Sequence, residues 1–166
     1  MESKQKTMEQ GHAASARALN LAISTKHSVE ISRYLRYKNT SFAKTFLEDV
    51  IELNKAVPFK RFTKDMGHKA GMSAGRFPEK AAREFLQLIK SVEANAQNKG
   101  LDTANLKIVK LLANKASIPF TGGRLQHAKK RTHLEVMVKE RKAPTTTSTA
   151  KQKTEKTHKA KAEGAQ

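Results

Sequence analysis

Hydrophobic and polar residues alternate along short stretches of the chain, a pattern that predicts β-strands. Near the N-terminus, Leu19, Leu21 and Ile23 alternate with small and polar residues and predict a short half-buried strand. Further along, 106–112 and 133–139 also have the composition and patterning of strands. The segment that joins these two contains Pro and Gly, so they are predicted to form a β-hairpin.

Other segments have apolar residues three or four positions apart, which predicts amphipathic helices. The first helix is expected to begin at Ser24 or Thr25, which are good N-cap residues, and to end near Tyr37. Asn39 is expected to cap the second helix. Its broad apolar face comprises Phe42, Phe46, Leu47, Val50, Ile51 and Leu53.

The third predicted helix has the strongest pattern. Pro78 opens it at a favoured first-turn position, and Gly100 is the expected left-handed residue at its end. Its buried stripe comprises Ala81, Phe85, Leu88, Ile89, Val92 and Ala96.

This order of elements predicts an α+β fold, in which a three-stranded antiparallel sheet carries three helices on one face. A basic β-hairpin is expected to protrude from it. The expected domain covers residues 16–142, between an N-terminal extension (1–15) and a basic tail (143–166) that are both expected to be disordered. The tail has no Leu, Ile, Val or aromatic residue and cannot bury enough surface to fold.

The net charge of the chain restricts the classes of partner that it can bind. The 166 residues include 33 Lys and Arg against 15 Asp and Glu, a net charge of +18. Much of this excess lies in the predicted domain, so a polyanionic partner is expected, most simply a nucleic acid. The absence of cysteine excludes disulfides and thiolate metal sites. No apolar run is long enough to span a membrane.

Signals of catalysis are weak. The six histidines have no metal-ligand spacing, and the glycine-containing stretch 67–71 lacks the spacing of a phosphate-binding loop. The acidic residues of 48–52 lie on the polar side of a predicted helix. The sequence therefore predicts no enzyme, no metal, no cofactor and no small-molecule substrate.

The segments 54–77 and 115–131 combine positive charge with glycine, which allows a close approach of backbone to phosphate. The candidate RNA-binding residues are Lys55, Lys60, Arg61, Phe62, Lys64, Lys69, Arg76, Lys115, Arg124, Lys129, Lys130 and Arg131. The aromatic residues of these segments can either stack on unpaired bases or anchor the loops to the core. They are Phe59, Phe62, Phe77 and Phe120.

Several separated motifs resemble ribosomal protein L twenty-two of the large subunit. They are VPFKRF (57–62), GRFPEKAA (75–82), EANA (93–96) and KGLD (99–102). The loop around 57–76 resembles the archaeal and eukaryotic branch, called L seventeen in eukaryotes. The stretches 114–116 and 132–136 resemble the two feet of the family's long hairpin. The resemblance covers about residues 16–141.

The resemblance implies a structural protein that binds large-subunit (23S-type) rRNA in the cytoplasmic ribosome. It implies a globular part near the exit of the polypeptide tunnel and a hairpin that lines the tunnel wall. The implied partners are this rRNA, neighbouring large-subunit proteins and the nascent polypeptide, with no membrane among them.

The hairpin departs from the family pattern. Only 117–131 lies between the two feet, and 118–124 stands where an arginine-rich tip belongs. About six residues fewer, or three per arm, correspond to roughly 10 Å less reach. The sequence therefore does not predict whether the hairpin reaches the tunnel constriction. A free architectural DNA- or RNA-binding protein with a basic arm is the alternative function.

Overall fold

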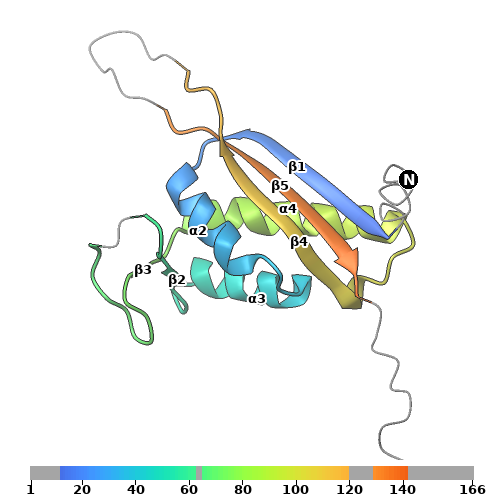
Figure 1. Ribbon diagram of the computed structural model, residues 1–166, viewed down its shortest axis with the longest axis horizontal. Helices are drawn as coiled ribbons and strands as arrows, with labels where there is room; N and C mark the ends of the chain where they lie inside the picture. The colour runs from blue at the N-terminus through green and yellow to red at the C-terminus, as the bar shows by residue number, and fades with distance from the viewer. Residues whose placement is uncertain (1–11, 63–64, 120–128, 142–166) are drawn as a thin grey trace, which may run out of the picture.

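The computed structural model describes residues 12–62, 65–119 and 129–141. Its main sheet is antiparallel with strand order β1-β5-β4 (Figure 1). The three strands are β1 (Ala13–Leu21), β4 (Leu106–Lys115) and β5 (Thr132–Glu140). Strands β4 and β5 pair from Leu106 opposite Glu140 to Lys115 opposite Thr132. The predicted pair of strands is thus confirmed, and each strand is longer than expected.

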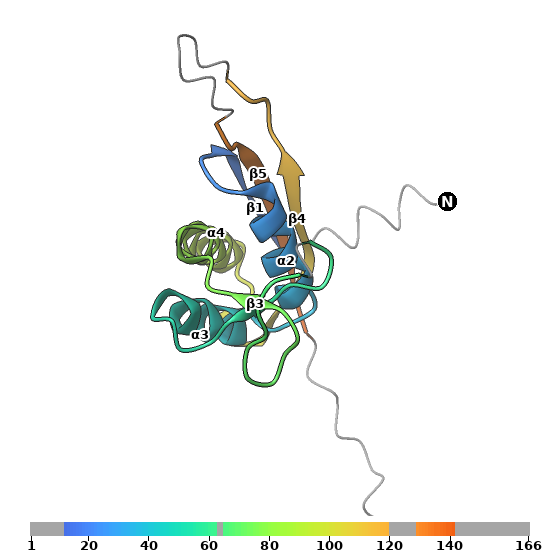
Figure 2. The same ribbon diagram turned by 90° about the vertical axis from the view of Figure 1, so that its left-hand side faces the viewer.

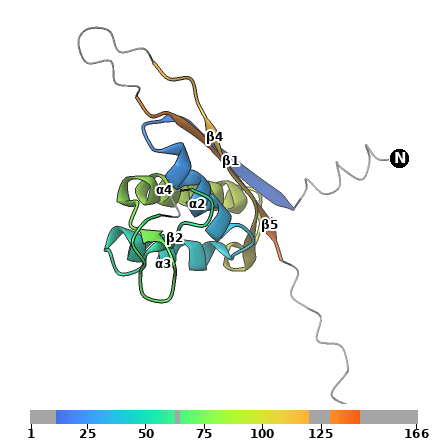
Figure 3. The ribbon, with the colours of Figure 1, turned by 60° about the vertical axis from the view of Figure 1, so that its left-hand side comes forward.

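All three helices cover one face of this sheet (Figure 3). They are α2 (Thr25–Leu35), α3 (Thr40–Ile51) and α4 (Glu79–Asn98). Helix α2 packs on β4, and α4 packs on β1 and β5. Helix α3 lies beside α4, and both are seen almost end-on in Figure 2. The α+β class is therefore confirmed.

The core lies between α4 and the sheet. Every residue of the stripe predicted for the third helix is buried, and the Phe85 side chain has no exposed surface. The inner face of the sheet contributes Ile108, Leu111, Leu134, Val136 and Val138, all buried. The apolar residues that recur with helical spacing on α4 and those that alternate along β5 thus pack together in one apolar layer.

The phase predicted for the first strand is wrong at Leu19, whereas Leu21 packs against the core and Ile23 is buried. Leu19 is 67% exposed, while Ala14 and Ala16 are buried against the helices. The strand starts at Ala13, so 13–15 belong to the sheet and not to a disordered extension. Alanine was not recognised as the core residue here, although its small side chain lets α4 approach β1 closely. The pairing then shifts register between Ala18 and Leu21.

Two details at helix ends also differ from the prediction. Phe42 is 44% exposed, and Leu53 is 53% exposed because α3 ends before it and its φ is +66°. Pro78 precedes the first helical residue of α4 instead of standing in the first turn.

The predicted end of α4 is confirmed. Gly100 has a φ of +71°, and its N–H donates to Gln97 O at 2.9 Å. The N–H of Leu101 donates to Ala96 O at 3.0 Å. These two bonds form a Schellman motif, which requires a residue that tolerates a left-handed backbone. A short 3₁₀ turn, η1 (Thr103–Asn105), then leads into β4.

The segment 54–77 is not wholly irregular. It contains a second, two-stranded antiparallel sheet of β2 (Val57–Pro58) and β3 (Gly75–Arg76). The N–H of Phe59 extends this pairing by donating to Ala74 O at 2.9 Å. A Cβ atom at Gly75 would lie 2.7 Å from Met72 Sδ, so the close packing of this loop favours glycine there.

Candidate nucleic-acid interface

A buried carboxylate fixes the backbone of the basic loop. Glu30, on α2, is 1% exposed and accepts hydrogen bonds from the N–H groups of Lys60, Arg61 and Phe62 at 3.2, 2.8 and 2.8 Å. Three donors satisfy a carboxylate that burial would otherwise penalise. We call this arrangement the Glu30 clamp. It holds the loop backbone against α2 and leaves Lys60 and Arg61 exposed.

The aromatic residues of the loop play different parts. Phe59 is 2% exposed, and its ring meets His27 edge-on at 5.4 Å, so it anchors the loop to the core. Phe62 and Phe77 are only half-buried. Arg61 lies over the Phe62 ring at 5.4 Å, and Lys69 lies over the Phe77 ring at 5.5 Å. Phe120 lies outside the described residues.

The charges of both basic segments act on His27. Burial lowers the pKa of His27, and the positive charges of Arg76 and Lys130 lower it further. Arg76 belongs to the loop and Lys130 to the hairpin. Residues separated by more than fifty positions in the sequence therefore influence the same imidazole near the start of α2.

The remaining predicted residues are in different environments. Lys55 is exposed, but its ammonium lies 2.6 Å from the carboxylate of Asp49, which neutralises part of its charge. Arg131 is half-buried and donates to Asn20 O at 3.1 Å. The other exposed residues of the predicted set are Lys60, Arg61, Lys69, Arg76, Lys115, Lys129 and Lys130. Lys64 and Arg124 lie outside the described residues.

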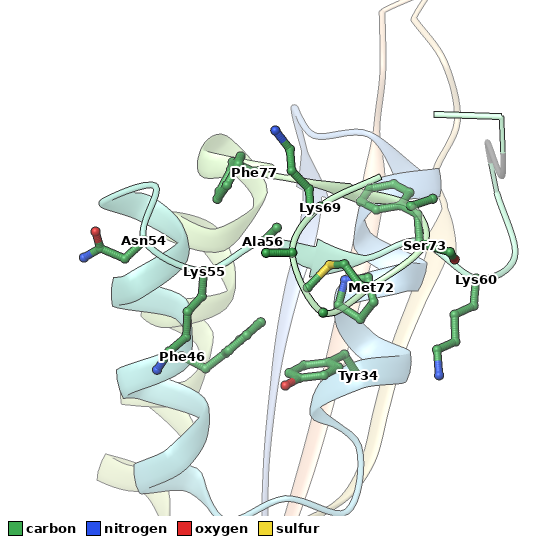
Figure 4. Close-up of a pocket in the computed structure, with 15 residues that line it drawn as sticks. Tyr34, Phe46, Asn54, Lys55, Ala56, Lys60, Lys69, Met72, Ser73 and Phe77 are labelled. Carbon is green, nitrogen blue, oxygen red and sulfur yellow. The ribbon is translucent and has the colours of Figure 1, made fainter. Parts of the chain in front are cut away.

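A cavity of about 670 Å³ opens between the loop, α2 and α3 (Figure 4). Tyr34 and Phe46 form one wall with ring centroids 4.4 Å apart, and Met72 faces them from the loop. Lys60 and Lys69 point outward from its rim. The cavity can accept a flat or apolar group of modest size.

The face of the sheet opposite the helices also carries charge. Arg17 and Lys110 both pair with Glu135, at 3.3 and 3.1 Å. The hydrogen bond from Lys110 lowers the pKa of Glu135, and the charge of Arg17 adds to this. The acid on β5 is thus shared between two bases, and the face stays net positive around it.

Sequence reasoning missed Glu30 and Arg33, on α2, and Arg36, which directly follows this helix. A charged residue beside Ile31 in a helical register is the only signal that could have identified Glu30 as buried. Arginines on a helix are typical of a solvated surface, so only the folded structure shows that Arg33 and Arg36 line a cavity together with Arg61.

Across 12–62, 65–119 and 129–141, no group of three or more His, Asp or Glu is placed to hold a metal ion. In the same ranges, no helix is both long and apolar enough to cross a membrane. What the arrangement offers is a rigid backbone that presents cations, together with partly exposed aromatic rings. Such a surface can bind a polyanion with unpaired bases.

Comparison with known proteins gives the class. The model of the family described as Ribosomal protein L22p/L17e matches residues 16–139. The large ribosomal subunit protein uL22 of Methanoculleus marisnigri is 42% identical over 143 residues, which cover 81% of this chain and 94% of the relative. The protein of the same name from Archaeoglobus fulgidus is 43% identical over 116 residues, covering 68% of this chain and 75% of the relative. That of Methanosphaera stadtmanae is 47% identical over 108 residues, covering 63% and 70%.

The chain belongs to this family of ribosomal proteins. The family is structural and not enzymatic. The resemblance inferred from the separated motifs is therefore confirmed.

Proposed function

We propose that this protein is a structural component of the large ribosomal subunit that binds large-subunit rRNA. Its relatives carry the name of a large-subunit protein, and the match spans most of both chains. The ribosome implies a cytoplasmic location. Neighbouring large-subunit proteins and rRNA are the partners.

The observation that carries the proposal is the set of cations without carboxylate partners on the clamped loop and the hairpin base. The Glu30 clamp presents Lys60 and Arg61, while Arg76 and Lys130 act on the same imidazole. No ion pair with a carboxylate occupies these four cations within the described residues. Phosphates are the natural counter-charges for such a surface.

The finer proposal concerns the polypeptide tunnel. We place the globular part near the tunnel exit and assign the hairpin to the tunnel wall, where it meets the nascent polypeptide. The hairpin segments 116–119 and 129–131 run beyond the helices, away from the body of the fold (Figure 1), which supports an arm that reaches into surrounding RNA. Exposed Lys129 and Lys130 on this arm suit that role.

A gradient experiment tests the proposal. Native lysate is sedimented through sucrose at high salt, and fractions are analysed by mass spectrometry. We expect the chain to remain with the large subunit. Release of the chain into the light fractions, with binding to any duplex added, would instead support the free architectural protein, whose affinity falls steeply with salt.

A further inference from the structure

A small cavity between α2, the edge strand β4 and the clamped loop is lined by arginines. It has a volume of about 340 Å³. Arg33 of α2, Arg36 just after α2 and Arg61 of the loop line it together with Ser32 and the β4 stretch 111–114. No carboxylate is among the lining residues. Three positively charged residues that line one cavity repel one another unless an anion offsets their charges.

Two residues that line this cavity each have a buried polar atom without a partner. Ser32 is 3% exposed, and its Oγ makes no hydrogen bond. The Nε of Arg36 is likewise buried and unpaired. Buried polar groups in folded proteins are nearly always satisfied, so an unsatisfied hydroxyl and an unsatisfied guanidinium N–H beside one cavity indicate a missing acceptor.

Hydrogen bonds within the protein hold the residues around this cavity in place. The Nη2 of Arg36 donates to Leu111 O at 3.1 Å, which fixes the guanidinium against β4. The Glu30 clamp fixes the backbone of Arg61. Glu30 makes no ion pair within 4.0 Å with an arginine of the described chain, and both of its oxygens accept backbone N–H groups instead.

We propose that Ser32, Arg33, Arg36 and Arg61 form a binding site for one phosphate group of the RNA backbone. The guanidinium plane presents paired N–H donors that match two oxygens of a phosphate, and the serine hydroxyl supplies a further donor. The site rests on the proposed function, since it names where a single rRNA phosphodiester is held. Glu30 acts in it as a positioning residue, because it places Arg61.

The first test uses inorganic phosphate and the full chain. Thermal unfolding is followed in phosphate and in chloride of equal ionic strength. We expect phosphate to raise the Tm more than chloride does, and we expect Ser32→Ala and Arg36→Lys to abolish the difference. Arg83→Lys, on the exposed side of α4 beside Glu79, is the matched control and should keep it.

The second test uses purified large-subunit rRNA. Arg36→Lys keeps the charge but loses the planar fork, and it should weaken binding by roughly tenfold, whereas Arg83→Lys should not. Ser32→Ala separates binding from folding, because it removes an unpaired buried hydroxyl. It should weaken rRNA binding without lowering the Tm in chloride.

The outcomes separate the site from the proposed function. If rRNA binds tightly, phosphate does not raise the Tm, and both Ser32→Ala and Arg36→Lys bind rRNA like the unchanged chain, the site is wrong and the proposed function stands. If phosphate shifts the Tm but rRNA binding is insensitive to Ser32→Ala and Arg36→Lys, the pocket holds free phosphate only, and the backbone assignment is overturned. If the unchanged chain shows no preference for rRNA over arbitrary duplex, the proposed function fails, and the phosphate arm still decides whether the anion site exists.

Discussion

The loop and the hairpin are both basic, but the protein holds them in opposite ways. The loop is fixed by its own domain through the Glu30 clamp, the buried Phe59 ring and the β2–β3 pairing. The hairpin is held by its feet in the sheet, and beyond Ala116 its described residues 117–119, 129 and 130 are exposed. Two segments of similar charge are thus suited to two ways of binding RNA. The loop is a preformed surface, whereas the hairpin is an arm whose contacts must come from a partner.

This difference has an energetic consequence. A surface that is already ordered loses little conformational entropy on binding, whereas ordering side chains and backbone at an arm costs free energy at the moment of contact. We therefore expect the loop to contribute to binding of free rRNA, and the hairpin to contribute mainly when surrounding RNA encloses it.

The largest expected effect comes from the core that carries both regions. Phe85→Ala should lower the free energy of unfolding by about 3–5 kcal/mol, because a fully buried aromatic ring on α4 is removed and a cavity remains. Chemical denaturation measures it. A loss below about 1 kcal/mol would show that Phe85 does not hold α4 to the sheet.

The next effect should separate the loop from the hairpin. Glu30→Gln replaces one acceptor oxygen by an NH₂ group that faces backbone donors, so it should cost about 1–3 kcal/mol. Amide hydrogen exchange should accelerate at 60–62 while β4 and β5 stay protected. Glu79→Gln, at the surface of α4, is the control. Unchanged exchange at 60–62 would mean that the clamp does not order the loop.

A smaller effect on stability is expected for the hairpin arm. Replacing 118–130 by Asn-Gly leaves a three-residue loop, Ser117-Asn-Gly, between the paired residues Ala116 and Arg131. The domain should fold with nearly unchanged Tm, but incorporation into large subunits should be impaired. Failure of the shortened chain to fold would place the arm within the core.

The smallest effect concerns pH. The folded state lowers the pKa of His27, so the folded protein binds fewer protons than the unfolded chain, and stability should fall as pH drops below about 6.5. His27→Gln should lessen this part of the pH dependence. Melting curves between pH 8 and pH 5.5 give the comparison, and equal slopes for the two proteins would exclude the imidazole as a source.

The periodic parts of the fold were predictable, while the site was predictable only in part. Alternation identified β5, and helical spacing identified the buried stripe of α4, because large apolar residues occupy both. The phase of β1 was missed because small alanines form its buried side. The positions of Glu30 and Arg36 depend on partners about thirty and seventy-five residues away, and no local pattern reports such contacts.

The central claim is that the clamped loop and the hairpin base bind rRNA phosphates, and the salt dependence of rRNA binding tests it most directly. Affinities are measured over a range of salt for Lys60→Glu/Arg61→Glu, Lys129→Glu/Lys130→Glu and, as a control of equal charge change on α4, Lys80→Glu/Lys90→Glu. The first variant should flatten the log–log slope by roughly 0.7–0.9 per lost phosphate contact, the hairpin variant should do so less in free rRNA, and the control should not. Equal slopes for all three variants and the unchanged chain would contradict the account.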